Sequence, residues 1–184
     1  MGSSIDQRAT YLQLQKAANQ KLQDLYAKDL HFELDKINEP ILWVKNMPNL
    51  FAVICYLQTD EIFKINYLSD LTAYDNIDHI DGDKRFVLVY QLLSLETKVS
   101  VRLKLLIDDS EDAKTISHIF PAANWLEREV FDMYGIVFRG HPDLRRIMMD
   151  ERFIGHPQRK EYDIKQRMPF ADNMKTNLDR NPVP

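Results

Sequence analysis

Two apolar segments on either side of a short polar turn constrain the fold of this chain more than any other feature. Phe86–Leu95 (FVLVYQLLSL) is apolar at most positions, which predicts a buried strand. After the turn Glu96–Lys98, apolar side chains recur at every second position, namely Val99, Val101, Leu103, Leu105 and Ile107. A period of two predicts a strand with one wet face, so the two segments are expected to pair as an antiparallel hairpin.

The other periodic segments complete a mixed pattern of helices and strands. Helices are expected at Asp6–Lys28, Asn49–Gln58 and Pro121–Tyr134, and further strands at His31–Leu34, Ile41–Val44 and the end of Ile62–Tyr74. After Gly135 no long periodic segment occurs. We therefore predict a two-layer α+β domain at residues 1–134, with a mainly antiparallel sheet and helices on one face. An extended C-terminal arm that wraps partner subunits is predicted at residues 135–184.

Composition excludes several classes of protein. A single cysteine, Cys55, rules out a disulfide framework, and its apolar context FAVICYL predicts a buried, inert thiol. The longest apolar run, Phe86–Leu95, is far shorter than the ~20 residues that cross a bilayer. The first residues lack the apolar core of a secretory signal. We expect a chain that is soluble or held at a membrane only through partners.

Motifs of nucleotide binding and catalysis are missing from the sequence. It contains no glycine-rich phosphate loop, dinucleotide fingerprint, serine-hydrolase elbow or C-x-x-C pair. A net charge of −4 disfavours a general nucleic-acid binder, whose affinity comes from neutralising phosphates. The chain is therefore not expected to be an enzyme by itself.

Arginine is concentrated in the last third of the chain. Residues 125–184 contain 8 Arg and 3 Lys, whereas residues 1–124 contain 3 Arg and 10 Lys. The planar guanidinium suits bidentate and desolvated contacts, whereas lysine suits a solvated surface. This bias favours a C-terminal third that another molecule covers, with compositional drift as the alternative.

The helix predicted at Pro121–Tyr134 has two unlike faces. At 100° per residue, one side is apolar and expected to face the core, with Leu126, Val130, Met133 and Tyr134. The other side is expected to be exposed and carries Trp125, Arg128, Glu129 and Asp132. Arg128 and Asp132 are spaced as an i,i+4 ion pair. Because an exposed tryptophan among charges is typical of an interface centre, partner contact is favoured over a plain solvated face.

A metal site on this helix is disfavoured. Glu127, Glu129 and Asp132 are candidate ligands, and the spacing of Glu129 and Asp132 occurs in metal-binding bundles. Such bundles also need histidines at E-x-x-H spacing, and no E-x-x-H or H-E-x-x-H occurs in this sequence.

A G-H-P pattern occurs twice, as GHPDLRR from Gly140 and GHPQRK from Gly155. Glycine allows an unusual backbone angle and proline restrains the residue before it, so each repeat is expected to form a rigid turn. We expect His141 and His156 to hydrogen-bond backbone groups, because their spacing matches no zinc pattern. The arginines that follow, Arg145, Arg146 and Arg159, are expected to meet acids on a partner. Internal pairing with the acids at 150–151 is the alternative.

These motifs together resemble one protein family. The runs ANWLEREVFDMYGI (123–136) and FRGHPDLRRIM (138–148) closely resemble the signature of the 30 kDa subunit, also called the C-type subunit, of proton-translocating NADH:quinone oxidoreductase, respiratory complex I. GHPQRKEY (155–162) and LTAYD (71–75) are similar to further motifs of that family. The family usually continues with Asp, then Phe or Tyr, and then Pro after R-K, whereas this chain has Glu161, Tyr162, Asp163 and Ile164. From Lys165 onward no family pattern matches.

The resemblance implies a structural and assembly subunit of the hydrophilic arm of complex I, which transfers electrons from NADH to quinone and translocates protons. It implies no cofactor in this chain, since the iron–sulfur clusters and flavin are in partner subunits. The implied partners are the 49 kDa-type quinone-site subunit and neighbouring iron–sulfur subunits, in a hetero-oligomer without nucleic acid. The implied location is peripheral, at the cytoplasmic face of the bacterial inner membrane or the matrix side in an organelle. The residues expected at the partner interface, none of them catalytic, are Trp125, Glu127, Arg128, Glu129, Asp132, His141, Arg145, Arg146, His156 and Arg159.

Two alternatives stay open at this point. The first is the equivalent subunit of a related complex, such as a membrane-bound hydrogenase or the ferredoxin-dependent photosynthetic type, because other chains provide the electron-input module. The second is a stand-alone metal-dependent enzyme that uses His141, His156 and nearby acids.

Overall fold

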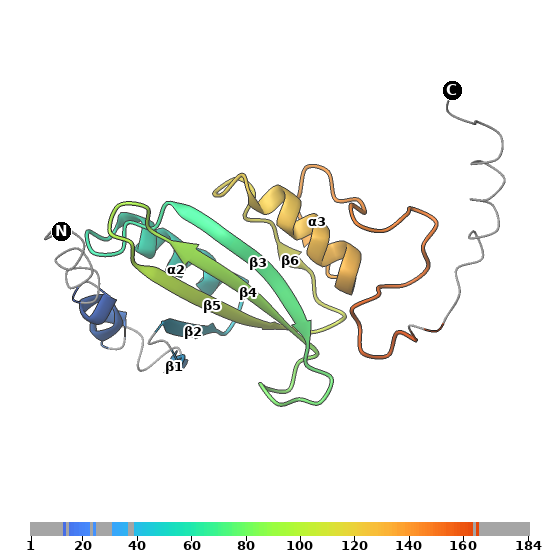
Figure 1. Cartoon of the computed structure of the whole chain (residues 1–184), viewed down its shortest axis with the longest axis horizontal. Helices are drawn as coiled ribbons and strands as arrows, with labels where there is room; N and C mark the ends of the chain where they lie inside the picture. The colour runs from blue at the N-terminus through green and yellow to red at the C-terminus, as the bar shows by residue number, and fades with distance from the viewer. Residues whose placement is uncertain are drawn as a thin grey trace, which may run out of the picture.

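A five-stranded sheet forms the centre of the computed structural model, which describes residues 13, 15–22, 24, 31–36, 39–163 and 165 (Figure 1). In chain order its strands are β1 (His31–Leu34), β2 (Pro40–Val44), β3 (Tyr67–Asp75), β4 (Phe86–Leu93) and β5 (Ser100–Ile107). In space the order is β1-β2-β5-β4-β3, and every neighbouring pair is antiparallel except β2 with β5. The predicted α+β class with a mainly antiparallel sheet is confirmed.

The predicted hairpin is formed by β4 and β5. Its register places apolar side chains opposite one another, as Phe86 with Ile107, Leu88 with Leu105, Tyr90 with Leu103 and Leu92 with Val101. Because side chains alternate between faces, all eight point to the same side of the sheet and are buried there. The first strand ends at Leu93, two residues earlier than predicted, because the turn begins at Ser94, whose carbonyl accepts the N–H of Lys98 at 3.0 Å.

Both long helices pack on this apolar face, as predicted. They are α2 (Met47–Thr59) and α3 (Ala123–Tyr134), and their buried side chains join those of the sheet in one core. Ala18 and Leu22, from the helical residues 15–22, belong to the same core. The rest of the helix predicted at Asp6–Lys28 lies largely outside the described residues.

Helix α2 corrects the expectation for Cys55. The helix begins after Asn46, whose side-chain oxygen accepts the N–H of Asn49 at 3.0 Å. It buries one stripe, Leu50, Val53, Ile54 and Leu57. Cys55 lies on the opposite side and is exposed, so the prediction of a buried thiol is wrong. The residues next to Cys55 in the sequence are apolar, but only one side of α2 packs on the sheet, and the sequence context did not show on which side Cys55 lies.

Strand β5 places Arg102 and Lys104 on the other face of the sheet, in agreement with the wet face expected for this strand. Arg102 crosses this face, with Nη2 2.8 Å from Oε2 of Glu39 and Nε 2.9 Å from Oε1 of Gln91. Arg102 thus links three parts of the chain on this face.

After α3 the chain first returns to the core and then runs without helix or strand to residue 163 (Figure 1). Two short strands that the sequence did not predict, β6 (Ala113–Lys114) and β7 (Phe138–Arg139), pair in parallel. Ile136 and Phe138 are buried in the core. The division into a domain at residues 1–134 and a C-terminal arm at residues 135–184 stays a prediction, although these two residues pack with the domain. Across the described ranges, no helix is both long and apolar enough to span a bilayer.

Candidate partner interface

The C-terminal end of α3 is closed by the second G-H-P turn (residues 155–158) and the arginine after it. A helix leaves its last four carbonyls without partners inside the helix. Here all four accept hydrogen bonds. The carbonyls of Phe131 and Asp132 accept from Gly135 N (2.8 Å) and His156 Nδ1 (2.9 Å). The carbonyls of Met133 and Tyr134 accept from Gln158 N (3.1 Å) and Arg159 Nε (2.6 Å). The guanidinium of Arg159 also places a positive charge at the negative end of the helix dipole. The predicted backbone contact of His156 is thus confirmed.

Gly135 makes this closure possible. Its φ of 80° is in the left-handed region, where a Cβ atom is strained. A Cβ at this position would also lie 2.6 Å from Nε2 of His156. The glycine is therefore required both by the backbone angle and by the close approach of the turn.

Asp132 organises the segment at 145–149 that covers the middle of α3. It is fully buried, and its Oδ2 accepts the backbone N–H groups of Ile147, Met148 and Met149 at 3.1, 2.8 and 2.8 Å. Its Oδ1 lies 2.6 Å from Nη1 of Arg146. Burial alone would raise the pKa of Asp132, but the three N–H donors and Arg146 outweigh it and lower the pKa. The carboxylate is therefore a fixed negative charge around which the covering segment folds.

Arg128 holds the same segment from the other side. Its Nε donates to the carbonyl of Arg145 at 3.1 Å and its Nη2 to the carbonyl of Arg146 at 3.3 Å. The guanidinium also lies over the ring of Trp125, 5.0 Å from the centroid. One buried arginine thus fixes both the covering segment and the orientation of an exposed tryptophan.

Glu127 is the third buried charged residue of α3. Its Oε1 accepts the N–H of Ile116 at 2.7 Å, in the loop between β6 and α3. Among the described residues Oε2 has no hydrogen-bond partner, and the nearest basic group is Nε2 of His141 at 4.0 Å. Burial raises the pKa of Glu127 to about 7, against the smaller lowering effect of hydrogen bonds from Thr115 and Ile116.

His141, in the first G-H-P turn (residues 140–143), connects that turn to the start of α3. Its Nε2 lies 3.0 Å from the carbonyl oxygen of Asn124, and its Nδ1 accepts the N–H of Asp143 at 3.0 Å. The carbonyl can only accept and the amide can only donate, so the proton is on Nε2 and the imidazole is neutral. The predicted backbone contact of His141 is confirmed.

The exposed face predicted for α3 is partly wrong. Trp125 and Glu129 are exposed as expected, but Arg128 and Asp132 are buried. The expected pair of Arg128 with Asp132 does not form, since Asp132 pairs with Arg146 and Arg128 with backbone carbonyls. The physical reason is that residues 140–159 lie against this side of the helix and supply its partners. Whether the ten residues named from the sequence contact another chain stays a prediction.

The arginines after the two G-H-P turns also find acids within the chain. Arg146 pairs with Asp132, Arg159 with Asp109 at 2.6 Å, and Arg145 with Asp143 at 3.0 Å. Internal pairing, the alternative raised from the sequence, therefore holds for these contacts, although the acids differ from those at 150–151. The Arg145–Asp143 pair is mostly exposed and leaves both groups within reach of a partner.

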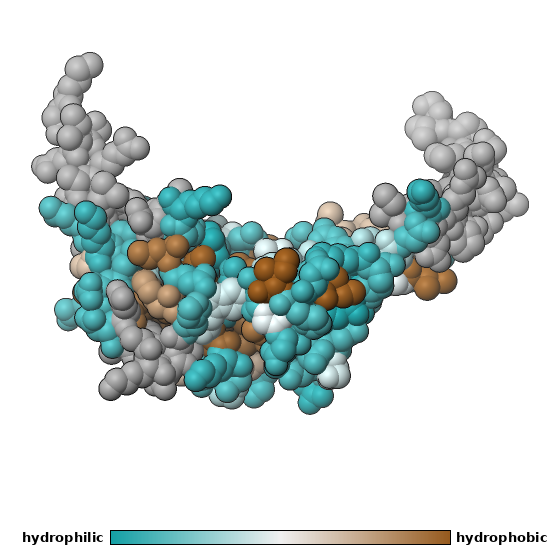
Figure 2. Space-filling view, turned by 90° about the horizontal axis from the view of Figure 1, so that it is seen from below, coloured by the Kyte–Doolittle hydropathy of each residue, from teal (hydrophilic) through white to brown (hydrophobic). Residues whose placement is uncertain are grey.

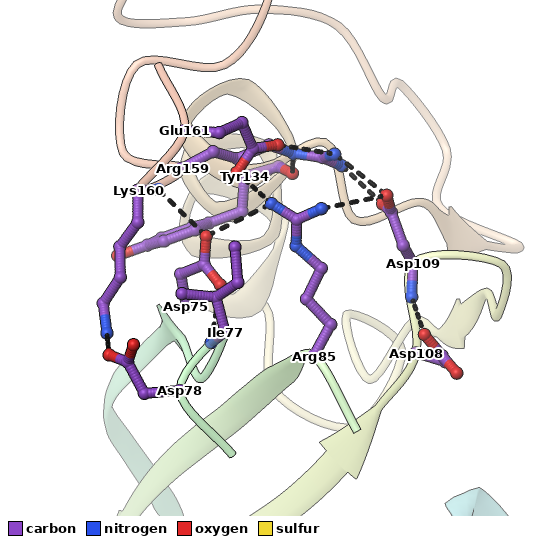
Figure 3. A network of polar contacts seen from close by, with 10 residues as sticks. All are labelled: Asp75, Ile77, Asp78, Arg85, Asp108, Asp109, Tyr134, Arg159, Lys160 and Glu161. Carbon is purple, nitrogen blue, oxygen red and sulfur yellow. Dashed lines mark hydrogen bonds and ion pairs between the residues drawn. The ribbon is translucent and has the colours of Figure 1, made fainter. Parts of the chain in front are cut away.

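A second polar network ties the C-terminal arm to the end of the sheet (Figure 3). Arg85 lies between three acids, Asp75 at 3.3 Å, Asp109 at 3.6 Å and Glu161. The backbone N–H of Lys160 donates to Oδ2 of Asp75 at 2.9 Å. No role for Asp75 was predicted from the sequence, although it ends the LTAYD motif that the family resemblance had singled out. This motif was the available signal for the missed contact.

Large apolar side chains are exposed on and around the described part of the C-terminal arm, which from here on is called the ordered arm (residues 135–163). Five of the ten that are exposed in the described part of the chain are Trp125, Val137, Ile147, Met148 and Ile154. Trp125, Met148 and Ile154 are 61%, 65% and 71% exposed. Seen from below, the molecule carries separate apolar patches within a hydrophilic surface (Figure 2). Patches of this kind are typical of protein contact sites.

Two buried charged side chains of α3 are engaged within the chain. Arg128 donates to backbone carbonyls, and Asp132 accepts backbone N–H groups and pairs with Arg146. No group of three His, Cys, Asp or Glu residues able to hold a metal occurs within the described ranges. Exposed apolar side chains and the exposed Arg145 lie at the surface of this part of the chain.

Comparison with known proteins gives a consistent result. Residues 43–168 match the family model described as respiratory-chain NADH dehydrogenase, 30 kDa subunit. The C-type subunit of NADH-quinone oxidoreductase from Cereibacter sphaeroides is 44% identical over 117 residues, covering 63% of this chain and 57% of that protein. The same subunit from Geotalea uraniireducens is 34% identical over 157 residues, covering 84% of this chain and 92% of that protein. The chain thus spans little more than half the length of the first relative and most of the second.

A solved structure shares the fold. It is a chain from the structure of the membrane-bound sulfane sulfur reductase, described as an archaeal respiratory membrane complex. The TM-score is 0.59 at 21% sequence identity, over 92% of this chain and 95% of that chain. At this identity the likeness supports the architecture of the sheet and helices.

Proposed function

Since the chain belongs to the family of the respiratory-chain NADH dehydrogenase 30 kDa subunit, we propose that it is a structural and assembly subunit of NADH:quinone oxidoreductase. In this role it supports electron transfer from NADH to quinone, coupled to proton translocation, without carrying out the chemistry itself. The flavin and the iron–sulfur clusters belong to partner subunits, and this chain holds no cofactor of its own. Its similarity to the C-type subunits of several NADH-quinone oxidoreductases supports this assignment.

The observation that carries the proposal is the ordered arm on α3. Asp132, Arg128 and His156 hold residues 140–159 with their polar groups satisfied inside the chain. The surface that remains outside includes the exposed apolar side chains of Trp125, Met148 and Ile154. Tryptophan, methionine and arginine are enriched at the centres of protein interfaces, so this surface suits a partner subunit.

The ten residues named from the sequence divide into two roles. Trp125, Glu129 and Arg145 are exposed and contact the partner directly. The other seven make contacts within the chain that support this surface, and they are Glu127, Arg128, Asp132, His141, Arg146, His156 and Arg159. The partner that we propose is the 49 kDa-type quinone-site subunit, with iron–sulfur subunits of the hydrophilic arm as neighbours. The chain is then peripheral, held through the complex at the cytoplasmic face of the bacterial inner membrane.

Isolation of the native assembly tests the proposal. The tagged chain is extracted from membranes with a gentle detergent, separated on a native gel stained for NADH oxidation, and analysed by mass spectrometry. We expect one large NADH-oxidising band that contains quinone-site and iron–sulfur subunits. A large band with the same core subunits but no NADH oxidation would assign the chain to a related complex. Recovery of the chain alone, from membranes that retain intact complexes, would overturn the proposal.

A matched pair of variants tests the surface itself. Trp125→Ala is expected to lower incorporation into the complex while changing the melting temperature of the free chain little, because the side chain is 61% exposed. Tyr67→Ala, at the start of β3 and 44% exposed, is the control that should assemble normally. Equal incorporation of the two variants would mean that docking does not use the surface around Trp125.

A further inference from the structure

A buried acid without a counter-ion lies beneath the first G-H-P turn. The carboxyl of Glu127 is fully buried, and its Oε2 is unpartnered within the described residues. The hydroxyl of Tyr90 on β4, also fully buried, is likewise without a partner in the described part of the chain. An ionised carboxylate in this place would have the Ile116 N–H on Oε1 but no donor among the described residues on Oε2 to replace water, so the neutral acid is favoured.

The groups that face Glu127 come from three elements besides its own. The loop after β6 supplies the Ile116 N–H and the Thr115 hydroxyl, β4 supplies the Tyr90 phenol, and the C-terminal arm supplies the His141 imidazole. From α3 itself, the cation of Arg128 is turned toward the carbonyls at 145 and 146. The charged residue nearest α3 on β3, Asp75, is engaged with Arg85 and Lys160. His141 is therefore the basic group within ion-pair distance among the described residues, and its hydrogen bonds make it neutral.

We propose that Glu127 and His141 form a proton-sensitive latch that holds the first G-H-P turn on α3. While Glu127 is protonated, His141 keeps both of its backbone contacts, to the carbonyl of Asn124 and the N–H of Asp143. When Glu127 loses its proton, the buried anion needs a donor. His141 can turn its Nε2–H to Oε2 only by leaving Asn124. This change releases residues 140–143.

The turn held by the latch comes just before a segment of the proposed docking surface in the sequence. After Asp143 and Leu144 come Arg145 and Arg146, the first two residues of the segment held by Arg128 and Asp132. Release of the turn therefore loosens the start of that segment and its exposed side chains. This consequence for docking depends on the proposed function, whereas the latch is a property of the chain itself and is tested on the chain alone.

Hydrogen–deuterium exchange of the purified full chain tests the latch. Exchange of amides in residues 139–145 is measured at about pH 6 and about pH 8.5 for the wild type, Glu127→Gln and Glu129→Gln, and variants are compared at the same pH so that intrinsic exchange rates cancel. Glutamine at 127 mimics the protonated acid and cannot ionise. Glu129 is exposed on the same helix and provides the matched control.

At about pH 6 the three proteins are expected to exchange alike in this segment. At about pH 8.5 the wild type and Glu129→Gln should exchange roughly tenfold faster than Glu127→Gln, because the acid has then lost its proton. Equal exchange of the wild type and Glu127→Gln at both pH values would overturn the latch.

A second measurement keeps the proposal falsifiable if Glu127→Gln does not fold. The carboxyl carbon of Glu127, labelled with ¹³C in the wild-type chain, is followed by NMR as the pH is raised. Titration near neutral pH, together with a simultaneous shift of the His141 ring signals, is the expected result. Titration in the ordinary range of exposed glutamates, or without any response of His141, would overturn the latch and leave the proposed docking surface untouched.

Discussion

Oδ1 of Asp132 lies 2.6 Å from Nη1 of Arg146, in an ion pair between α3 and the C-terminal arm. Asp132 belongs to α3, whereas Arg146 belongs to the segment that covers this side of the helix. The side chains are 0% and 16% exposed, so the pair is largely removed from water. The same carboxylate also accepts three successive backbone N–H groups, which makes it the fixed point of the arm.

Asp132→Asn is expected to lower the free energy of unfolding by about 3 kcal/mol. The amide removes the charge that Arg146 faces and can direct its own N–H groups at backbone donors. Urea denaturation of the full chain measures the loss. Asp143→Asn is the control, because its pair with Arg145 is exposed and worth roughly 1 kcal/mol at most. Similar losses for both variants would show that the carboxylate of Asp132 does not organise the arm.

The stability of the chain is expected to fall as the pH rises from mildly acidic to neutral. The unfolded chain releases the proton of Glu127 near pH 4.5, whereas the folded chain keeps it to about pH 7. Between these values the folded state binds more protons, so each pH unit costs about 1.4 kcal/mol and the total is roughly 3 kcal/mol. Glu127→Gln should remove this slope, and Glu129→Gln should keep it. Denaturation curves at several pH values with the same slope in both variants would contradict the assignment.

Gly135→Ala is expected to destabilise the chain by about 2 to 3 kcal/mol. A Cβ atom would meet Nε2 of His156 at 2.6 Å and Nη2 of Arg159 at 2.9 Å, which pushes the second turn off the helix end. Gly140→Ala tests the backbone angle alone, since its φ is 82° but its Cβ would meet Thr115 only at 3.4 Å. That control should lose about 1 kcal/mol. Thermal or urea unfolding measures both, and equal losses would remove the argument from close approach.

Arg145→Ala is expected to lower incorporation into the complex without changing the stability of the free chain. Its side chain is 66% exposed and its pair with Asp143 contributes little. Arg146→Ala should instead destabilise the chain, because it leaves Asp132 without its charge partner. Native gels and melting curves of the two variants separate these effects. Unchanged incorporation of Arg145→Ala would exclude this arginine from the interface.

Arg85→Met is expected to cost about 2 kcal/mol, because the carboxylate of Asp75 is 2% exposed and would lose its counter-ion. The loss should be accompanied by faster amide exchange at residues 159–162, which the same network holds. Lys64→Met is the control, since Lys64 pairs with Glu96 at the surface and is 47% exposed. If the two variants unfold alike, the network adds nothing beyond an ordinary surface pair.

The sheet could be predicted from sequence because its signal is local. The period of two in residues 99–107 requires one buried face, and the register of β4 with β5 follows from it. Two-residue strands such as β6 and β7 are too short to show a period. They form because Ala113 and Phe138 are brought together by elements far apart in the chain.

The burial of charged residues on α3 could be predicted from the sequence only in part. At 100° per residue Glu127 is about 60° from Val130, so its position already bordered the apolar face. Naming it among the residues of the partner interface ignored that position. Asp132 and Arg128 carry no such signal, because their side of the helix is buried by a segment that begins eight residues after Asp132. Which side of a helix a downstream arm will cover depends on contacts that no local pattern encodes.

The closure of α3 by His156, Gln158 and Arg159 has a consequence for how the chain is made. On the ribosome, the helix is complete at Tyr134, but the groups that satisfy its last carbonyls are synthesised more than twenty residues later. Until then the end of the helix is capped only by Gly135 and water. The helix therefore gains its final stability only when residues 156–159 dock on it, and a chain truncated before residue 156 is expected to have an α3 with a frayed last turn.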